Sequence, residues 1–190
     1  MVCSADDSYG ALITDPESWR ATAKGLVIAS TALVPAIEQF WIDRRLARRW
    51  DDRQVAIYFM LCAFALENLM KAKLVENMLA AGTLSTDINE FPKELKSHDL
   101  SALATKCNAP ETAEEYASIL SRLSRSAIWY ARYPAPTAPV QLNNKSESPA
   151  GVPLSLSEYS SHDRCEVHHL LHEFGYPAEG CEFDFCTFRR

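Results

Sequence analysis

Apolar side chains dominate the stretch from Val55 to Leu66, which reads VAIYFMLCAFAL and carries no charge. The run contains neither Gly nor Pro and continues into ENLMKAKLVENMLAAG, so its length favours one long helix over a buried strand. A helix that is apolar on all sides lies in the middle of a bundle. A bilayer-spanning helix needs ~20 apolar residues, so this shorter run indicates a buried core and no membrane partner.

The pattern becomes amphipathic after Leu66, with Leu69, Met70 and Leu74 expected to face the core. The charged positions on this second half are then predicted to lie in solvent. They are Glu67, Lys71, Lys73 and Glu76.

Helical patterns also precede the central segment. Residues 1–13 show no periodicity and predict a loose lead-in, whereas Thr14-Asp15-Pro16-Glu17 predicts a helix start with a capping side chain and a Pro in the first turn. Pro35 should kink or divide the helix that starts there, because Pro lacks a backbone donor and clashes with the preceding turn.

Three more helices are expected after the central one, which should end near Gly82 in a left-handed conformation. Ser97 is predicted to cap a short helix reaching about Cys107. Pro110 opens a longer one whose apolar stripe stops near Pro134. The last helix should end at Gly175.

Together these elements predict an all-α fold, an up-and-down bundle of five to six helices in a single domain. Its parts are N-terminal helices over 14–50, a core over 53–134, a long Pro-rich loop over 135–155, a last helix over 156–175 and an irregular tail over 176–190.

The composition is that of a globular protein, with 47% hydrophobic and 23% charged residues. The net charge of -6 argues against binding to duplex DNA by bulk electrostatics. The acidic start MVCSADDSYG does not resemble a secretory signal, which favours the cytoplasm. Cys62 and Cys107 fall in helical patterns, as expected of reduced, buried thiols.

Three segments in order resemble the HEPN domains: ALENLMKA at 65–72, LKSHDL at 95–100 and ARYP at 131–134. The resemblance implies an all-α bundle of four to five helices, of a kind common in bacterial defence and toxin systems. Members that cut RNA do so as dimers without metal, through an Arg and a His four to six residues later. Here that pair is Arg164 and His169, with Cys165 where a polar residue usually follows the Arg.

The histidines between 162 and 172 admit three interpretations. In a ribonuclease, Arg164 would hold the scissile phosphate and His169 would move a proton. In a zinc site, the nitrogens of His168 and His172, one helical turn apart, would join two thiolates. Those thiolates would come from Cys181 and Cys186. The third interpretation is an exposed helix followed by a Cys-bearing tail.

Six further positions are candidates for ligand binding. The guanidinium of Arg132 beside Tyr133 suits a phosphate or a stacked base. The other four are part of the resemblance, and each also has a structural interpretation as a helix ion pair or a helix cap. They are Glu67, Lys71, His98 and Asp99.

No Gly-rich phosphate loop, GxSxG elbow or HExxH motif is present in the sequence, so we expect no cofactor. The aromatic residues Phe40, Trp41 and Trp50 beside several arginines favour a homodimer. Two functions follow as hypotheses: an accessory module that binds a protein, nucleotide or RNA partner, or a metal-independent endoribonuclease.

Overall fold

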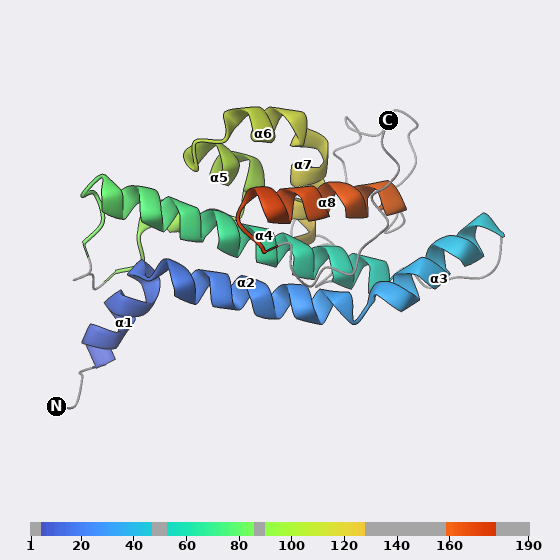
Figure 1. The fold of residues 1–190 in the computed structure, drawn as a ribbon, viewed down its shortest axis with the longest axis horizontal. Coiled ribbons are helices and arrows are strands. Elements are labelled where there is room, and N and C mark those ends of the chain that lie inside the picture. Colours follow the sequence, from blue (N-terminus) through green and yellow to red (C-terminus); the bar gives the residue numbers. More distant parts are fainter. Residues whose placement is uncertain (1–4, 47–52, 86–89, 128–158, 178–190) are drawn as a thin grey trace, which may run out of the picture.

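The structure is a computed structural model that describes residues 5–46, 53–85, 90–127 and 159–177 (Figure 1). The described part is helical and contains no strand, which confirms the all-α prediction. The Pro-rich loop over 135–155 and most of the tail over 176–190 lie outside the described residues.

Eight α-helices and one 3₁₀ helix follow one another along this part of the chain, more than the five to six predicted. They are α1 (Ala5–Thr14), α2 (Pro16–Thr31), α3 (Val34–Arg45), α4 (Arg53–Ala80), η1 (Lys93–Lys96), α5 (Leu100–Lys106), α6 (Pro110–Glu115), α7 (Ala117–Arg125) and α8 (Ser161–Glu173).

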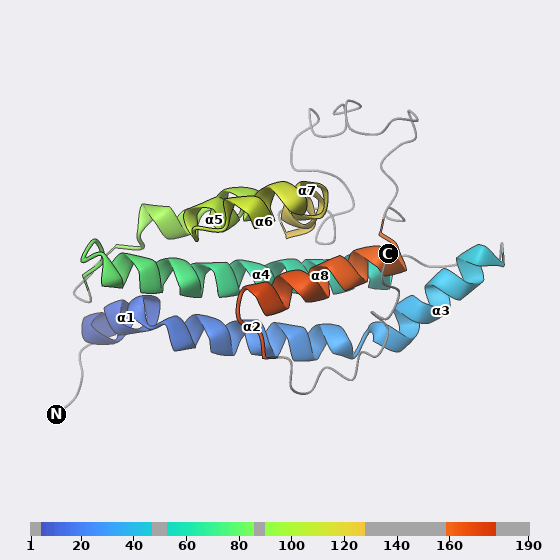
Figure 2. The ribbon, with the colours of Figure 1, turned by 45° about the horizontal axis from the view of Figure 1, so that its top comes forward.

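Helix α4 is the central element, as its apolar run predicts. Helix α2 lies antiparallel along one side of it and α5, α6 and α7 lie on the opposite side, while α8 packs against α4 and α7 (Figures 1 and 2). Side chains such as Phe59, Leu66 and Met70 have no exposed surface. Helix α4 is long and apolar enough to cross a membrane, but 72% of its most apolar window is buried inside the protein.

The N-terminal region differs from the prediction in one place and agrees with it in another. Residues 5–14 form α1 instead of a loose lead-in, and Thr14 ends that helix with its hydroxyl donating to the Gly10 carbonyl. Asp15 then caps α2, because its carboxylate accepts the backbone N–H groups of Glu17 and Ser18.

The predicted break near Pro35 is present, but it lies about one helical turn before the proline. Helix α2 ends at Thr31, and Pro35 lies in the first turn of α3, where its missing N–H costs nothing. The two helix axes differ by 46°. The far end of α3 therefore projects beyond the start of α4 (Figures 1 and 2).

Two other boundaries also shift. Asp99, and not Ser97, caps α5 by accepting the backbone N–H of Ala102. The stripe that begins at Pro110 is divided at Tyr116 into α6 and α7. Gly82 and Gly175 have φ angles of 65° and 94°, so both helix ends use the left-handed conformation expected of glycine.

We predict that Leu66→Asp abolishes folding, because the Leu66 side chain is fully buried and a carboxylate there would have no partner. Phe64→Asp is the matched control, since Phe64 lies on the same helix at an only partly buried position. Thermal unfolding followed by circular dichroism should show no cooperative transition for Leu66→Asp and a lowered one for Phe64→Asp. A cooperative melt of Leu66→Asp would contradict the central place of α4.

Candidate functional site

Glu67 and Lys71 form a buried ion pair on the inner part of α4. The Nζ of Lys71 donates to Oε1 of Glu67 at 2.6 Å, and the two side chains are only 7% and 5% exposed. The expectation that both would face solvent is therefore wrong. Lys73 is exposed as predicted, and Glu76 is half-buried beside Arg20 of α2.

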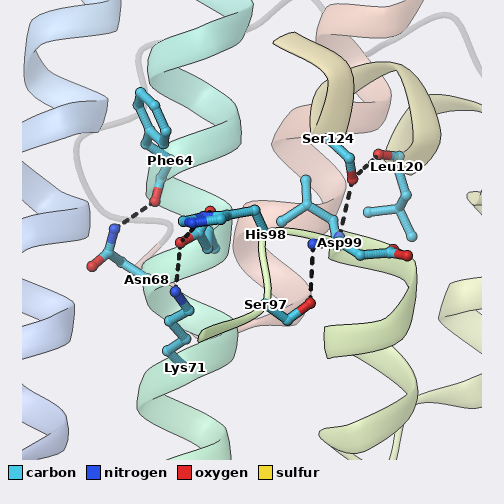
Figure 3. Close-up of polar contacts among 10 residues, drawn as sticks. Phe64, Asn68, Lys71, Ser97, His98, Asp99, Leu120 and Ser124 are labelled. Carbon is cyan, nitrogen blue, oxygen red and sulfur yellow. Dashed lines mark hydrogen bonds and ion pairs between the residues drawn. The ribbon is translucent and has the colours of Figure 1, made fainter. Parts of the chain in front are cut away.

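His98 contacts the carboxylate of this buried pair (Figure 3). Its Nδ1 lies 3.1 Å from Oε1 and 3.0 Å from Oε2 of Glu67, while the His98 side chain is 58% exposed. Two segments that are 31 residues apart in the sequence thus contribute to one cluster. We call Glu67, Lys71 and His98 the α4 polar cluster.

The chain around His98 is held in place by hydrogen bonds to its neighbours. Asp99 caps α5, and the backbone N–H of Leu100 donates to the Ser124 hydroxyl at 3.0 Å. That hydroxyl in turn donates to the Leu120 carbonyl at 2.8 Å (Figure 3). Helix α7 therefore fixes the start of α5, and with it the position of the preceding imidazole.

Aromatic residues cover the other end of the α4 polar cluster. The ammonium of Lys71 lies 5.7 Å from the centre of the Trp19 ring, a distance that suits a cation–π contact. Trp19 donates its indole N–H to the Ile13 carbonyl and meets the Phe91 ring edge to face at 6.2 Å. These rings exclude water from the ammonium while the carboxylate remains in contact with a surface histidine.

The hydrogen bonds determine which nitrogen of His98 carries the proton. An ionised carboxylate only accepts, so Nδ1 must donate to Glu67. In the neutral imidazole Nε2 then carries a lone pair, and no described residue binds it. A carboxylate that orients an imidazole in this way is the arrangement used in proton transfer and behind metal-binding histidines.

The two residues of the proposed catalytic pair both lie on α8, in different surroundings. Arg164 is buried, its guanidinium donates to Glu38 of α3 at 3.0 Å, and it lies 5.7 Å from the centre of the Trp41 ring. His169 is exposed. Positions five residues apart on a helix differ by a net rotation of roughly 140° about its axis. The side chains of Arg164 and His169 therefore leave α8 on different faces.

Neighbouring contacts give Arg164 a structural role. Trp41 donates its indole N–H to the Tyr159 carbonyl, and the Tyr159 ring stacks on Phe59 at 3.8 Å. On the adjacent position of α8, Asp163 pairs with Arg122 of α7. The Arg–Glu pair thus belongs to a network that joins α3, α7 and α8.

In the zinc alternative, each of the two histidine ligands has one ring nitrogen that already contacts a protein group. His168 Nε2 lies 3.4 Å from the Tyr58 hydroxyl, and His172 Nδ1 lies 2.9 Å from the Tyr176 carbonyl oxygen. Both rings line a pocket with room for about one water molecule, beside the buried Cys62 thiol. No metal-binding group of three side chains occurs among the described residues, and Cys181 and Cys186 lie outside them.

Burial changes the ionisation of the groups around this pocket. It lowers the pKa of His168 to about 4, with the nearby Arg164 charge acting in the same direction. It raises the pKa of the Cys62 thiol to about 11. At neutral pH the imidazole is uncharged and the thiol keeps its proton, so neither offers a reactive ionised group.

Arg132 and Tyr133 lie outside the described residues, so their predicted binding role stays a prediction. No local pattern in the sequence points to Glu38 or Trp19, because each reaches its partner only through the packing of distant helices. An acid and a lysine one turn apart within an apolar helix are the available signal for the α4 polar cluster.

No protein-family model, curated protein or solved structure matches this chain.

We predict that Glu67→Met destabilises the protein by about 3–5 kcal/mol, because Lys71 would remain buried without its partner. The double variant Glu67→Met/Lys71→Met removes both charges and should recover most of that loss. Urea unfolding of the wild type, both single variants and the double variant measures the difference. A double variant that loses the sum of both single effects would contradict this explanation of the pair.

We also predict a pH effect from His168. In the unfolded chain its pKa is near the ordinary 6.5 and in the folded protein about 4, so the unfolded state binds more protons between these values. The free energy of unfolding should therefore fall as the pH drops from about 6.5 to about 4, by up to about 3 kcal/mol.

The test compares the wild type with His168→Gln across this pH range. The fall should be shallower in His168→Gln, and His162→Gln should behave like the wild type because His162 is exposed. Equal slopes in the wild type and His168→Gln would contradict the prediction.

Proposed function

We propose that this chain is a HEPN-like accessory or binding module of the cytoplasm, of the kind found in bacterial defence and toxin systems. In this proposal its helices form an up-and-down bundle, and the surface around His98 contacts the partner. The observation that carries the proposal is the ion pair of Arg164 with Glu38, because a buried and neutralised guanidinium is not free to hold an RNA phosphate.

A protein partner fits the charges better than RNA or a nucleotide. The net charge is -6, and the α4 polar cluster contains one acid and one lysine that neutralise each other. An RNA surface would need several cations that contact phosphates. A protein partner needs only complementary shape and a few anchoring contacts around the exposed imidazole.

We further propose a homodimer, on a different basis from the aromatic residues. Phe40 is buried and Trp41 is bound to Tyr159, so these aromatics serve the fold, and Trp50 lies outside the described residues. Exposed apolar side chains at the projecting end of α3 support the dimer instead: Ile42 is 41% and Leu46 is 56% exposed.

Light scattering should give twice the chain mass for the wild type and a lower mass for Ile42→Asp/Leu46→Asp. A wild type that is monomeric at high concentration would contradict the proposed homodimer.

We predict that the protein does not cleave mixed RNA in EDTA, because Arg164 is held by Glu38 and leaves α8 on a different face from His169. Gel analysis of RNA incubated with the wild type and with His169→Ala provides the measurement. His162→Ala is a matched control, since His162 is another exposed histidine of α8.

Cleavage that survives EDTA, disappears in His169→Ala and persists in His162→Ala would contradict the binding module. It would establish the metal-independent ribonuclease instead.

A further inference from the structure

The exposed imidazole of His98 has three properties that no other described histidine has together. Its Nδ1 is bonded to an ionised carboxylate, its ring is mostly in solvent, and its Nε2 has no partner among the described residues. His162 faces Glu166 through Nε2 at 3.7 Å, so its carboxylate contact is at the opposite nitrogen. His172 donates to a neutral carbonyl and borders the pocket.

The cost of the cluster argues for a use beyond packing. Burying the Glu67–Lys71 pair removes two charges from water, and apolar side chains of similar size would serve the core at least as well. The carboxylate is nevertheless buried beneath a surface imidazole that it orients. The same effect is obtained at catalytic histidines, where a buried acid fixes the tautomer and stabilises the charge that forms.

We propose that Nε2 of His98 is a nucleophilic acceptor that takes a phosphoryl group from an acyl phosphate, a donor whose leaving group is a carboxylate. The inference rests on the proposed function only in that His98 faces a partner. A histidine that another protein must reach has to stand out from the surface, as a side chain 58% exposed does.

The step balances without any further reagent. The Nε2 lone pair forms a bond to phosphorus as the bond from phosphorus to the donor oxygen breaks, and the leaving carboxylate departs with that electron pair. The imidazole becomes positively charged while Nδ1–H remains donated to Glu67. In the resting state Glu67 is the negative partner of Lys71 in an ion pair. The positive charge that develops on the His98 imidazole therefore forms next to a carboxylate that is already ionised.

The experiment uses acetyl phosphate as the donor with the full chain at neutral pH. Intact-mass and peptide mass spectrometry locate the added phosphoryl group, and its lability in acid identifies a phosphohistidine. We expect the modification at His98, and its loss in His98→Gln. Glu67→Met/Lys71→Met should slow it about 10-fold, the scale at which a residue that orients a histidine usually acts.

Two comparisons distinguish an oriented imidazole from an accessible one. His162 and His169 are both exposed, so equal or faster modification there would overturn the proposal. An unchanged rate in a folded Glu67→Met/Lys71→Met variant would overturn it as well, as would the absence of modification at His98. None of these results is evidence for or against RNA cleavage. The RNA assay therefore tests the proposed binding module separately from this inference.

Discussion

The buried ion pair between Glu67 and Lys71 is the constraint around which the α4 helix and its neighbours are arranged. A helix through the centre of the protein can carry two charges only if each charge has a partner whose attraction offsets the cost of removing it from water. Lys71 meets that condition through Glu67 and the Trp19 ring, and Glu67 through Lys71 and His98. The cluster therefore links α4 to α2 through Trp19 and to the start of α5 through His98.

Much of the fold could be predicted from the sequence because it depends on local chemistry. The apolar run at 55–66, the capping carboxylate of Asp15 and the glycines at 82 and 175 each act within a few residues. The burial of Glu67 and Lys71 could not, since their pattern on the helix is that of an ordinary exposed pair. Only the cover supplied by Trp19, Phe91 and His98 reverses that expectation.

The candidate site shows the same limit. The resemblance implies a catalytic pair at Arg164 and His169, but it carries no information about Glu38, which lies 126 residues away and binds the guanidinium. The resemblance predicts His98 as a binding residue, and the contact of His98 with Glu67 joins two of the quoted segments in space. The HEPN-like assignment remains a proposal.

The tautomer of His98 tests the central claim most directly, because the proposed roles of His98 depend on Nδ1 donating to Glu67. Proton–nitrogen correlation spectra of the protein labelled at histidine can read that tautomer for the neutral ring. We predict the Nδ1–H form in the wild type, and its replacement by the Nε2–H form, which is common in free histidine, in Glu67→Met/Lys71→Met. A wild-type His98 already in the Nε2–H form would contradict the claim.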